Sequence, residues 1–144
     1  MEVRVIERSP PTWQSAGSPT TYRRILIVED EATLRRVIAR NLVGRGHLVR
    51  EAETVNAAIT AINAECPDLI LLDINLPDRT GWDLLRELRS LGVTIPTIIV
   101  SAVRVSQGRI AEFNPLAYLP KPFPLEALLR IVEGGCRATA AEGD

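Results

Sequence analysis

Four polar residues, each at the end of a short apolar run, could do chemistry together. They are Asp30 in ILIVEDE, Asp73 in LILLDINLP, Ser101 in TIIVSA and Lys121 in YLPKPF. In an open parallel α/β sheet the carboxyl ends of the strands face one crevice, so residues far apart in the chain can converge there. Two carboxylates, a hydroxyl and an ammonium group in one crevice are suited to metal-assisted phosphoryl transfer to a carboxylate.

The acidic residues favour a metal site. Glu29 and Asp30 are adjacent and repel each other unless a cation lies between them, although alone they are also typical of a helix start. Asp73 is expected beside Asp30, and three crowded acids suit Mg²⁺, which binds through carboxylates, waters and a phosphate. Lys121 would supply a second cation for a phosphoryl group on Asp73, and Ser101 a hydroxyl.

The elements that must position these residues follow from hydropathy patterning. Short apolar runs alternate with segments of helical periodicity, which predicts βα units and a parallel sheet covered on both faces. The runs expected to form strands are residues 25–28, 48–49, 69–72, 98–100 and 117–119. Helices are expected to end near Gly44, Gly92 and Gly134. Segment 104–116 has few apolar positions and Pro115 cuts it short, so a brief helix is the most it should form.

Basic residues away from these motifs are interpreted as surface. Arg35, Arg36 and Arg40 are expected on the solvated side of the first helix, with a docking surface for another protein as the alternative. His47 is the only histidine and is expected in an exposed loop, so a His-based metal site within the chain is not predicted.

Length and composition limit the remaining choices. At 144 residues one core is expected, with a flexible extension over 1–22, a domain over 23–137 and a short tail over 138–144. A net charge of −1 gives no general attraction to nucleic acid or to anionic membranes. No apolar run approaches the roughly 18 residues of a membrane span, so a cytoplasmic location is predicted. Only CRATAAEGD follows Gly135, so no effector domain is expected after it.

The motifs IVEDE, LLDINLPDRTG, IIVSA and YLPKPF, in this order, resemble the receiver domain of bacterial two-component response regulators. The resemblance covers roughly residues 23–137. It implies a doubly wound, flavodoxin-like α/β fold with five parallel strands in the order 2-1-3-4-5. It also implies a signalling switch that takes a phosphoryl group from a histidine kinase, and catalyses its own transfer and hydrolysis.

The metal ligands are also implied by the resemblance. Asp73 matches the phosphoacceptor and a ligand of Mg²⁺. Asp30 matches a direct ligand, Glu29 a ligand through water, and Asn75 a ligand through its backbone carbonyl. Gly81 matches part of the turn after the acceptor.

The remaining roles concern switching and signal lifetime. Lys121 matches the catalytic lysine, Ser101 the switch hydroxyl and Tyr118 the aromatic side chain that turns inward when the hydroxyl moves. In the family that the chain resembles, side chains two positions after the acceptor and two after the hydroxyl flank the path of the water that hydrolyses the acyl phosphate. Here they are Asn75 and Val103, so Val103 predicts slow dephosphorylation.

Three other functions would use parts of the same pattern. A phosphatase with an Asp nucleophile would need a second Asp where Asn75 stands. A flavodoxin-like cofactor binder would need a Ser/Thr/Gly loop where residues 29–31 are acidic. A receiver-like scaffold would dock without phosphorylation. The expected partners are a histidine kinase or phosphotransfer protein and an unknown protein target, without nucleic acid or membrane; a phosphorylation-dependent homodimer is left open.

Overall fold

A five-stranded parallel sheet forms the centre of the protein in a computed structural model that describes residues 23–134. The predicted N-terminal extension and C-terminal tail lie outside the described residues. The strands are β2 (Arg24–Val28), β3 (Leu48–Ala52), β4 (Leu69–Asp73), β5 (Thr97–Ser101) and β6 (Ala117–Pro120). Their order is β3-β2-β4-β5-β6, which confirms the predicted doubly wound topology.

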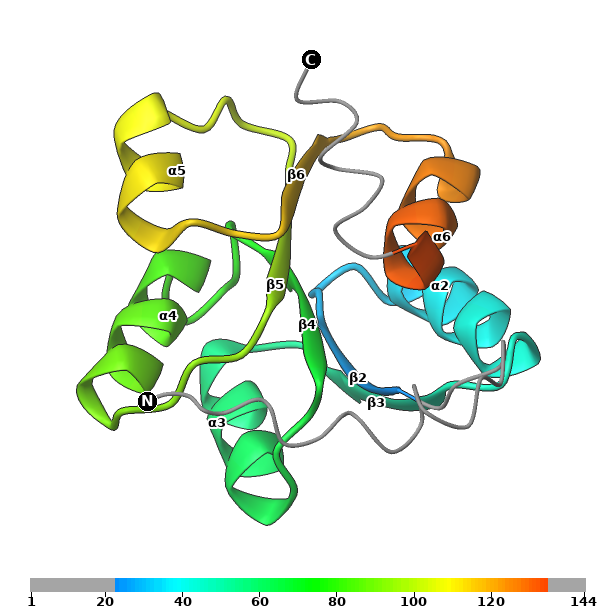
Figure 1. Ribbon diagram of the computed structural model, residues 1–144, viewed down its shortest axis with the longest axis horizontal. Coiled ribbons are helices and arrows are strands. Elements are labelled where there is room, and N and C mark those ends of the chain that lie inside the picture. The colour runs from blue at the N-terminus through cyan, green and yellow to red at the C-terminus, as the bar shows by residue number, and fades with distance from the viewer. Residues whose placement is uncertain (1–22, 135–144) are drawn as a thin grey trace.

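Four helices connect the strands, a fifth follows β6, and together they cover both faces of the sheet. They are α2 (Ala32–Gly44), α3 (Val55–Ala64), α4 (Gly81–Ser90), α5 (Gln107–Phe113) and α6 (Leu125–Gly134). Helices α2 and α6 lie on one face, and α3, α4 and α5 lie on the other (Figure 1). Within residues 23–134, no helix has the length and hydropathy needed to cross a membrane.

The core consists of two layers because the central strands are buried on both faces. In β2, Leu26 and Val28 belong to the layer beneath α3 and α4, whereas Ile25 and Ile27 belong to the layer beneath α2 and α6. All residues of β4 and β5 are buried. Such strands read as continuous apolar runs. This rigid centre fixes the positions at which Asp73 and Ser101 leave the sheet.

Local capping sets where the helices on one face begin. The Thr54 hydroxyl accepts a hydrogen bond from the amide of Ala57 at the start of α3. Thr80 and Asp83 form a capping box at the start of α4, in which each side chain accepts from the other's backbone amide. These caps fix the ends of the loops that surround the carboxyl edge of the sheet.

Helix α5 is brief, as predicted, and none of its seven residues is buried. Phe113 at its end stacks on Trp82 of α4 with ring centroids 5.2 Å apart. Arg86 and Arg89 of α4 also lie against the Phe113 ring, which adds cation–π contacts. Arg89 also donates to the carbonyl of Glu112, so the helix is attached to α4 through this aromatic stack and its arginine contacts.

Two predictions of surface exposure are wrong. Arg35 is only 9% exposed because it lies on the buried side of α2, together with Ile38 and Leu42. His47 is 7% exposed because the turn between α2 and β3 is tight, with the His47 amide donating back to the carbonyl of Leu42 at the end of α2. Neither residue lies on the solvated surface that the sequence predicted.

Candidate functional site

Three carboxylates meet at the carboxyl ends of β2 and β4. Glu29 and Asp30 directly follow β2, and Asp73 is the last residue of the neighbouring strand β4. One oxygen atom of each carboxylate lies within 4.8 Å of the others. Glu29 and Asp73 are 2% and 3% exposed, whereas Asp30 is open to solvent. The structure thus brings the predicted acidic residues together, with one carboxylate on the solvent side.

Lys121 reaches this cluster from the end of β6. Its Nζ atom lies 3.0 Å from Glu29 Oε1 and 3.2 Å from Asp73 Oδ2. The backbone places the lysine here, because its amide donates to the carbonyl of Ser101 on β5 at 2.8 Å. The Lys121–Pro122 peptide bond is cis. One ammonium group therefore bridges two buried carboxylates.

The charges in the cluster are not fully balanced. Burial raises the pKa of Glu29, with Lys121 and the Glu31 amide acting against it and Asp73 adding to it. Burial would lower the pKa of Lys121, but Glu29 and Asp73 hold it above its usual value. Among residues 23–134, Lys121 supplies the one cation paired with this cluster, so three carboxylates face a single ammonium group.

These features fit a hard divalent cation. The donor set is entirely oxygen, two of the three carboxylates are buried, and within the described residues their negative charge exceeds that of the paired ammonium group. Such oxygen ligands suit Mg²⁺ better than a transition metal. The residues present therefore could hold Mg²⁺ between Asp30 and Asp73.

The loop after Asp73, residues 74–80, is here called the acceptor loop. The amide of Asn75 donates to Asp73 Oδ1 at 3.2 Å, and Asn75 and Thr80 form an isolated antiparallel bridge. Gly81 closes the loop through a hydrogen bond from its amide to the carbonyl of Ile74. A Cβ atom at Gly81 would lie 2.7 Å from the carbonyl oxygen of Asp73, so only glycine fits there.

Ser101 lies at the end of β5 and is 1% exposed. Its hydroxyl donates to the carbonyl of Val103 at 2.9 Å and accepts from the amide of Val103 at 3.0 Å. The hydroxyl is therefore occupied by its own loop. Val103 itself is 54% exposed, and Tyr118 on β6 is half-buried against the core layer beneath α3 and α4.

Two residues beside the site were missed by the sequence analysis. Arg35 donates from Nη1 to the carbonyl of Glu29 and from Nε to Glu51 Oε1, both at 2.8 Å. Its spacing from Ile38 and Leu42 is the signal that could have placed it on the buried side. Asp78 binds the start of α3, and no local pattern in the sequence indicated that contact.

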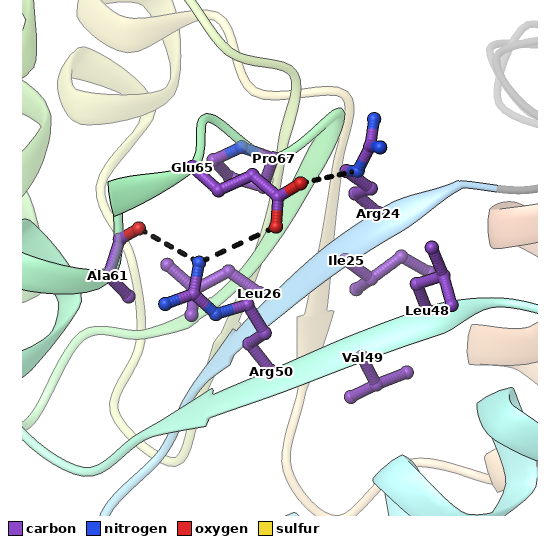
Figure 2. A pocket seen from close by; sticks show the side chains of 9 residues that line it. All are labelled: Arg24, Ile25, Leu26, Leu48, Val49, Arg50, Ala61, Glu65 and Pro67. Atoms are coloured by element: carbon purple, nitrogen blue, oxygen red, sulfur yellow. Dashed lines mark hydrogen bonds and ion pairs between the residues drawn. The ribbon is translucent and has the colours of Figure 1, made fainter. Parts of the chain in front are cut away.

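The opposite end of the sheet carries a different kind of hollow, a pocket of about 240 Å³ at the beginnings of β2 and β3 (Figure 2). Arg24 and Arg50 both form ion pairs with Glu65 at its edge. Its other side chains are apolar, among them Leu26 and Val49. The acidic cluster lies at the far ends of the strands and shares none of these lining residues.

Comparisons with known proteins agree with this geometry. The chain is 39% identical over 122 residues to the KDP operon transcriptional regulatory protein KdpE of Escherichia coli, covering 81% of this chain and 54% of that protein. The chain therefore spans about half the length of this relative.

Two solved structures share the fold. A receiver domain protein from Methanospirillum hungatei has a TM-score of 0.72 and 27% identity, covering 85% of this chain and 99% of that one. The response regulator TrrA from Thermotoga maritima, solved in complex with Mg²⁺ and BeF, has a TM-score of 0.68 and 25% identity, covering 77% and 96%. The model of the response regulator receiver domain family matches residues 25–133, and the chain belongs to that family.

Proposed function

We propose that this receiver domain is the phosphorylation-dependent switch of a two-component system, with Asp73 as the phosphoacceptor and Mg²⁺ as the cofactor. The observation that carries the proposal is the bridging of buried Asp73 and Glu29 by Lys121 Nζ, beside the solvent-facing Asp30. Burying ionisable groups is costly unless they are paired, so such a cluster is typical of a functional site.

The two oxygens of Asp73 have different environments. Oδ2 is held by Lys121 at 3.2 Å, and Oδ1 accepts from the amide of Asn75 at 3.2 Å. These contacts orient the carboxylate for attack on phosphorus, while the ammonium group stabilises the negative charge of the transferred group. Bound Mg²⁺ would neutralise further charge on the phosphoryl oxygens.

The ligand roles follow from exposure and pairing. Asp30 is accessible to a hydrated ion and would bind it directly with Asp73 and the carbonyl of Asn75. Glu29 is held by Lys121 and would act through a bound water. The complex of TrrA with Mg²⁺ and BeF supports this choice of cofactor.

Ser101 would transmit the phosphorylated state. To reach a phosphoryl oxygen, its hydroxyl must leave the two hydrogen bonds that it makes with Val103. Tyr118 lies on the neighbouring strand β6 and would fill the space that the hydroxyl vacates. The signal would therefore pass from the acceptor to the surface near β6 and α5.

The partners follow from this chemistry. A histidine kinase or phosphotransfer protein would supply the phosphoryl group in the cytoplasm, and a protein target would read the switch, without direct contact to nucleic acid or membrane. The chemistry is confined to the domain's own phosphorylation and dephosphorylation. We assign the domain to residues 23–137; a homodimer of phosphorylated chains is a further form that the output could take.

Asp73→Asn should abolish phosphorylation while leaving the fold intact, because the amide lacks the nucleophilic oxygen of a carboxylate. Purified protein would be treated with acetyl phosphate and Mg²⁺, then examined by intact mass and peptide mapping, with circular dichroism as the fold check. Asp68→Asn is the matched control, because Asp68 binds the Arg24 amide at the amino end of the sheet. Modification of another residue, or none in the parent protein, would overturn the assignment.

A further inference from the structure

The side chain of Asp78, at the tip of the acceptor loop, forms hydrogen bonds to the beginning of α3. Asp78 accepts hydrogen bonds from the amides of Val55 at 2.9 Å and Asn56 at 3.0 Å, one to each carboxylate oxygen. It also accepts from the amide of Arg79 at 2.9 Å. Asp78 and α3 are separated by the whole of β4 in the chain, so this contact joins two crossovers of the fold.

Helix α3 has its first amides satisfied by two different residues. The first four amides of a helix have no partner within it, and a carboxylate placed there also interacts favourably with the helix dipole. Thr54 caps the amide of Ala57 from the preceding position, at 2.9 Å. Asp78 caps the two amides before it from another loop. The two caps therefore stabilise the same helix, but only Asp78 belongs to the acceptor loop.

Arg79 adds a second connection at the same place. Its Nη2 atom donates to Asn56 Oδ1 at 3.3 Å, and its Nη1 atom donates to Glu87 Oε1 of α4 at 3.2 Å. Burial acts in the opposite direction, but the amides of Val55, Asn56 and Arg79 hold the pKa of Asp78 below its usual value. The carboxylate is therefore ionised at neutral pH, when charge-assisted hydrogen bonds are strongest.

Fastening the tip constrains the rest of the acceptor loop. The loop is closed at its base by the bridge between Asn75 and Thr80, and its end is fixed by the capping box of α4. Asn75, at that base, donates its amide to Asp73, and its carbonyl is the third metal ligand in the proposed function. A loop held at its base and at its tip has few ways to displace Asn75.

We propose that Asp78 is a positioning residue for the phosphorylation site: by capping α3 from the acceptor loop, it holds Asn75 and Asp73 in the geometry that binds Mg²⁺ and accepts the phosphoryl group. This inference rests on the proposed function. It assigns to an exposed residue outside the acidic cluster an influence on metal affinity that acts through Asn75 and Asp73. Residues that support metal ligands from behind commonly affect affinity by about 10- to 100-fold.

The test compares Asp78→Ala with Thr54→Ala, which removes a cap from the same helix without touching the acceptor loop. Mg²⁺ affinity would be measured by isothermal titration calorimetry, and phosphorylation by acetyl phosphate as a function of donor concentration. Hydrogen exchange without Mg²⁺ would report on residues 74–80. Asp78→Asn serves as the conservative variant, because its amide oxygen keeps one of the two acceptors.

Asp78→Ala should weaken Mg²⁺ binding by about tenfold, slow phosphorylation at saturating donor and speed exchange in residues 74–80. Asp78→Asn should lie between this variant and the parent, whereas Thr54→Ala should keep the parent affinity despite a lower melting temperature. Equal affinity changes in the two alanine variants, or none in Asp78→Ala, would reduce Asp78 to a helix cap and overturn the inference. Failure of the parent itself to bind Mg²⁺ or accept phosphate would instead refute the proposed function, and the inference with it.

Discussion

The two ends of the sheet differ in how deeply their charged side chains are buried. At the carboxyl end, Glu29 and Asp73 are almost fully buried and share the ammonium group of Lys121. At the amino end, Arg24 and Glu65 form an ion pair whose side chains are about half exposed, 53% and 49%. The same parallel sheet therefore supports costly buried charges at one end and ordinary surface pairs at the other.

The difference in burial makes charge more costly to folding at the carboxyl end than at the amino end. Exposed ion pairs contribute little, about 0–1 kcal/mol, because water screens them. Buried charges interact strongly but must be stripped of water, so a pair that loses one partner leaves an uncompensated charge. Folding stability should consequently depend on each member of the Glu29, Asp73 and Lys121 cluster at the carboxyl end.

The largest effect is expected from removing the ammonium group of the cluster. Lys121→Gln should destabilise the protein by about 3 kcal/mol, because Glu29 and Asp73 would be left buried without their cation. Arg24→Gln, the matched change at the amino end, should cost about 1 kcal/mol or less. Urea denaturation at neutral pH measures both. Mg²⁺ should restore part of the stability of the Lys121 variant and little in the Arg24 variant; similar losses in the two would contradict the comparison.

An intermediate effect concerns Val103, an exposed apolar side chain at this polar end. We expect a water attacking the phosphoryl group to pass between Asn75 and Val103, and a branched apolar side chain offers it no hydrogen bond. Val103→Gln should speed dephosphorylation by about 10- to 100-fold. Phosphoryl loss from purified, kinase-free protein measures this rate. Val103→Ala is the control for size alone, and a Gln variant that decays like the parent would remove this position from the control of lifetime.

The smallest effect sharpens the comparison at the amino end. Burial lowers the pKa of His47, as do Arg23 and Arg45, while Glu133 acts in the other direction. A depressed folded-state pKa gives stability that is present above the unfolded-state value of 6.5 and is lost as pH falls below it. Urea midpoints at pH 7.5 and 5.5 should therefore differ more in the parent than in His47→Leu. An unchanged difference would mean that His47 does not titrate with unfolding.

Much of this fold could be predicted because its information is local. The buried strands β4 and β5 are continuous apolar runs, and Asp73, Ser101 and Lys121 stand at strand ends whose convergence follows from parallel topology. The burial of Arg35 could have been read from helical spacing. The Asp78 contact could not, because it depends on how two loops from different crossovers meet in space.

Helix α5 has a thermodynamic consequence that follows from its lack of buried residues. An element whose residues are at most partly buried can shift or fray without opening the core, at the cost of the Trp82–Phe113 stack, its arginine contacts and the pairing of Arg89 with Glu112. Stacks of this kind contribute about 0.5–1.5 kcal/mol beyond the area they bury. The free energy that separates docked and undocked α5 is thus expected to be well below that needed to open the core, which places this helix among the first parts of the domain to change position.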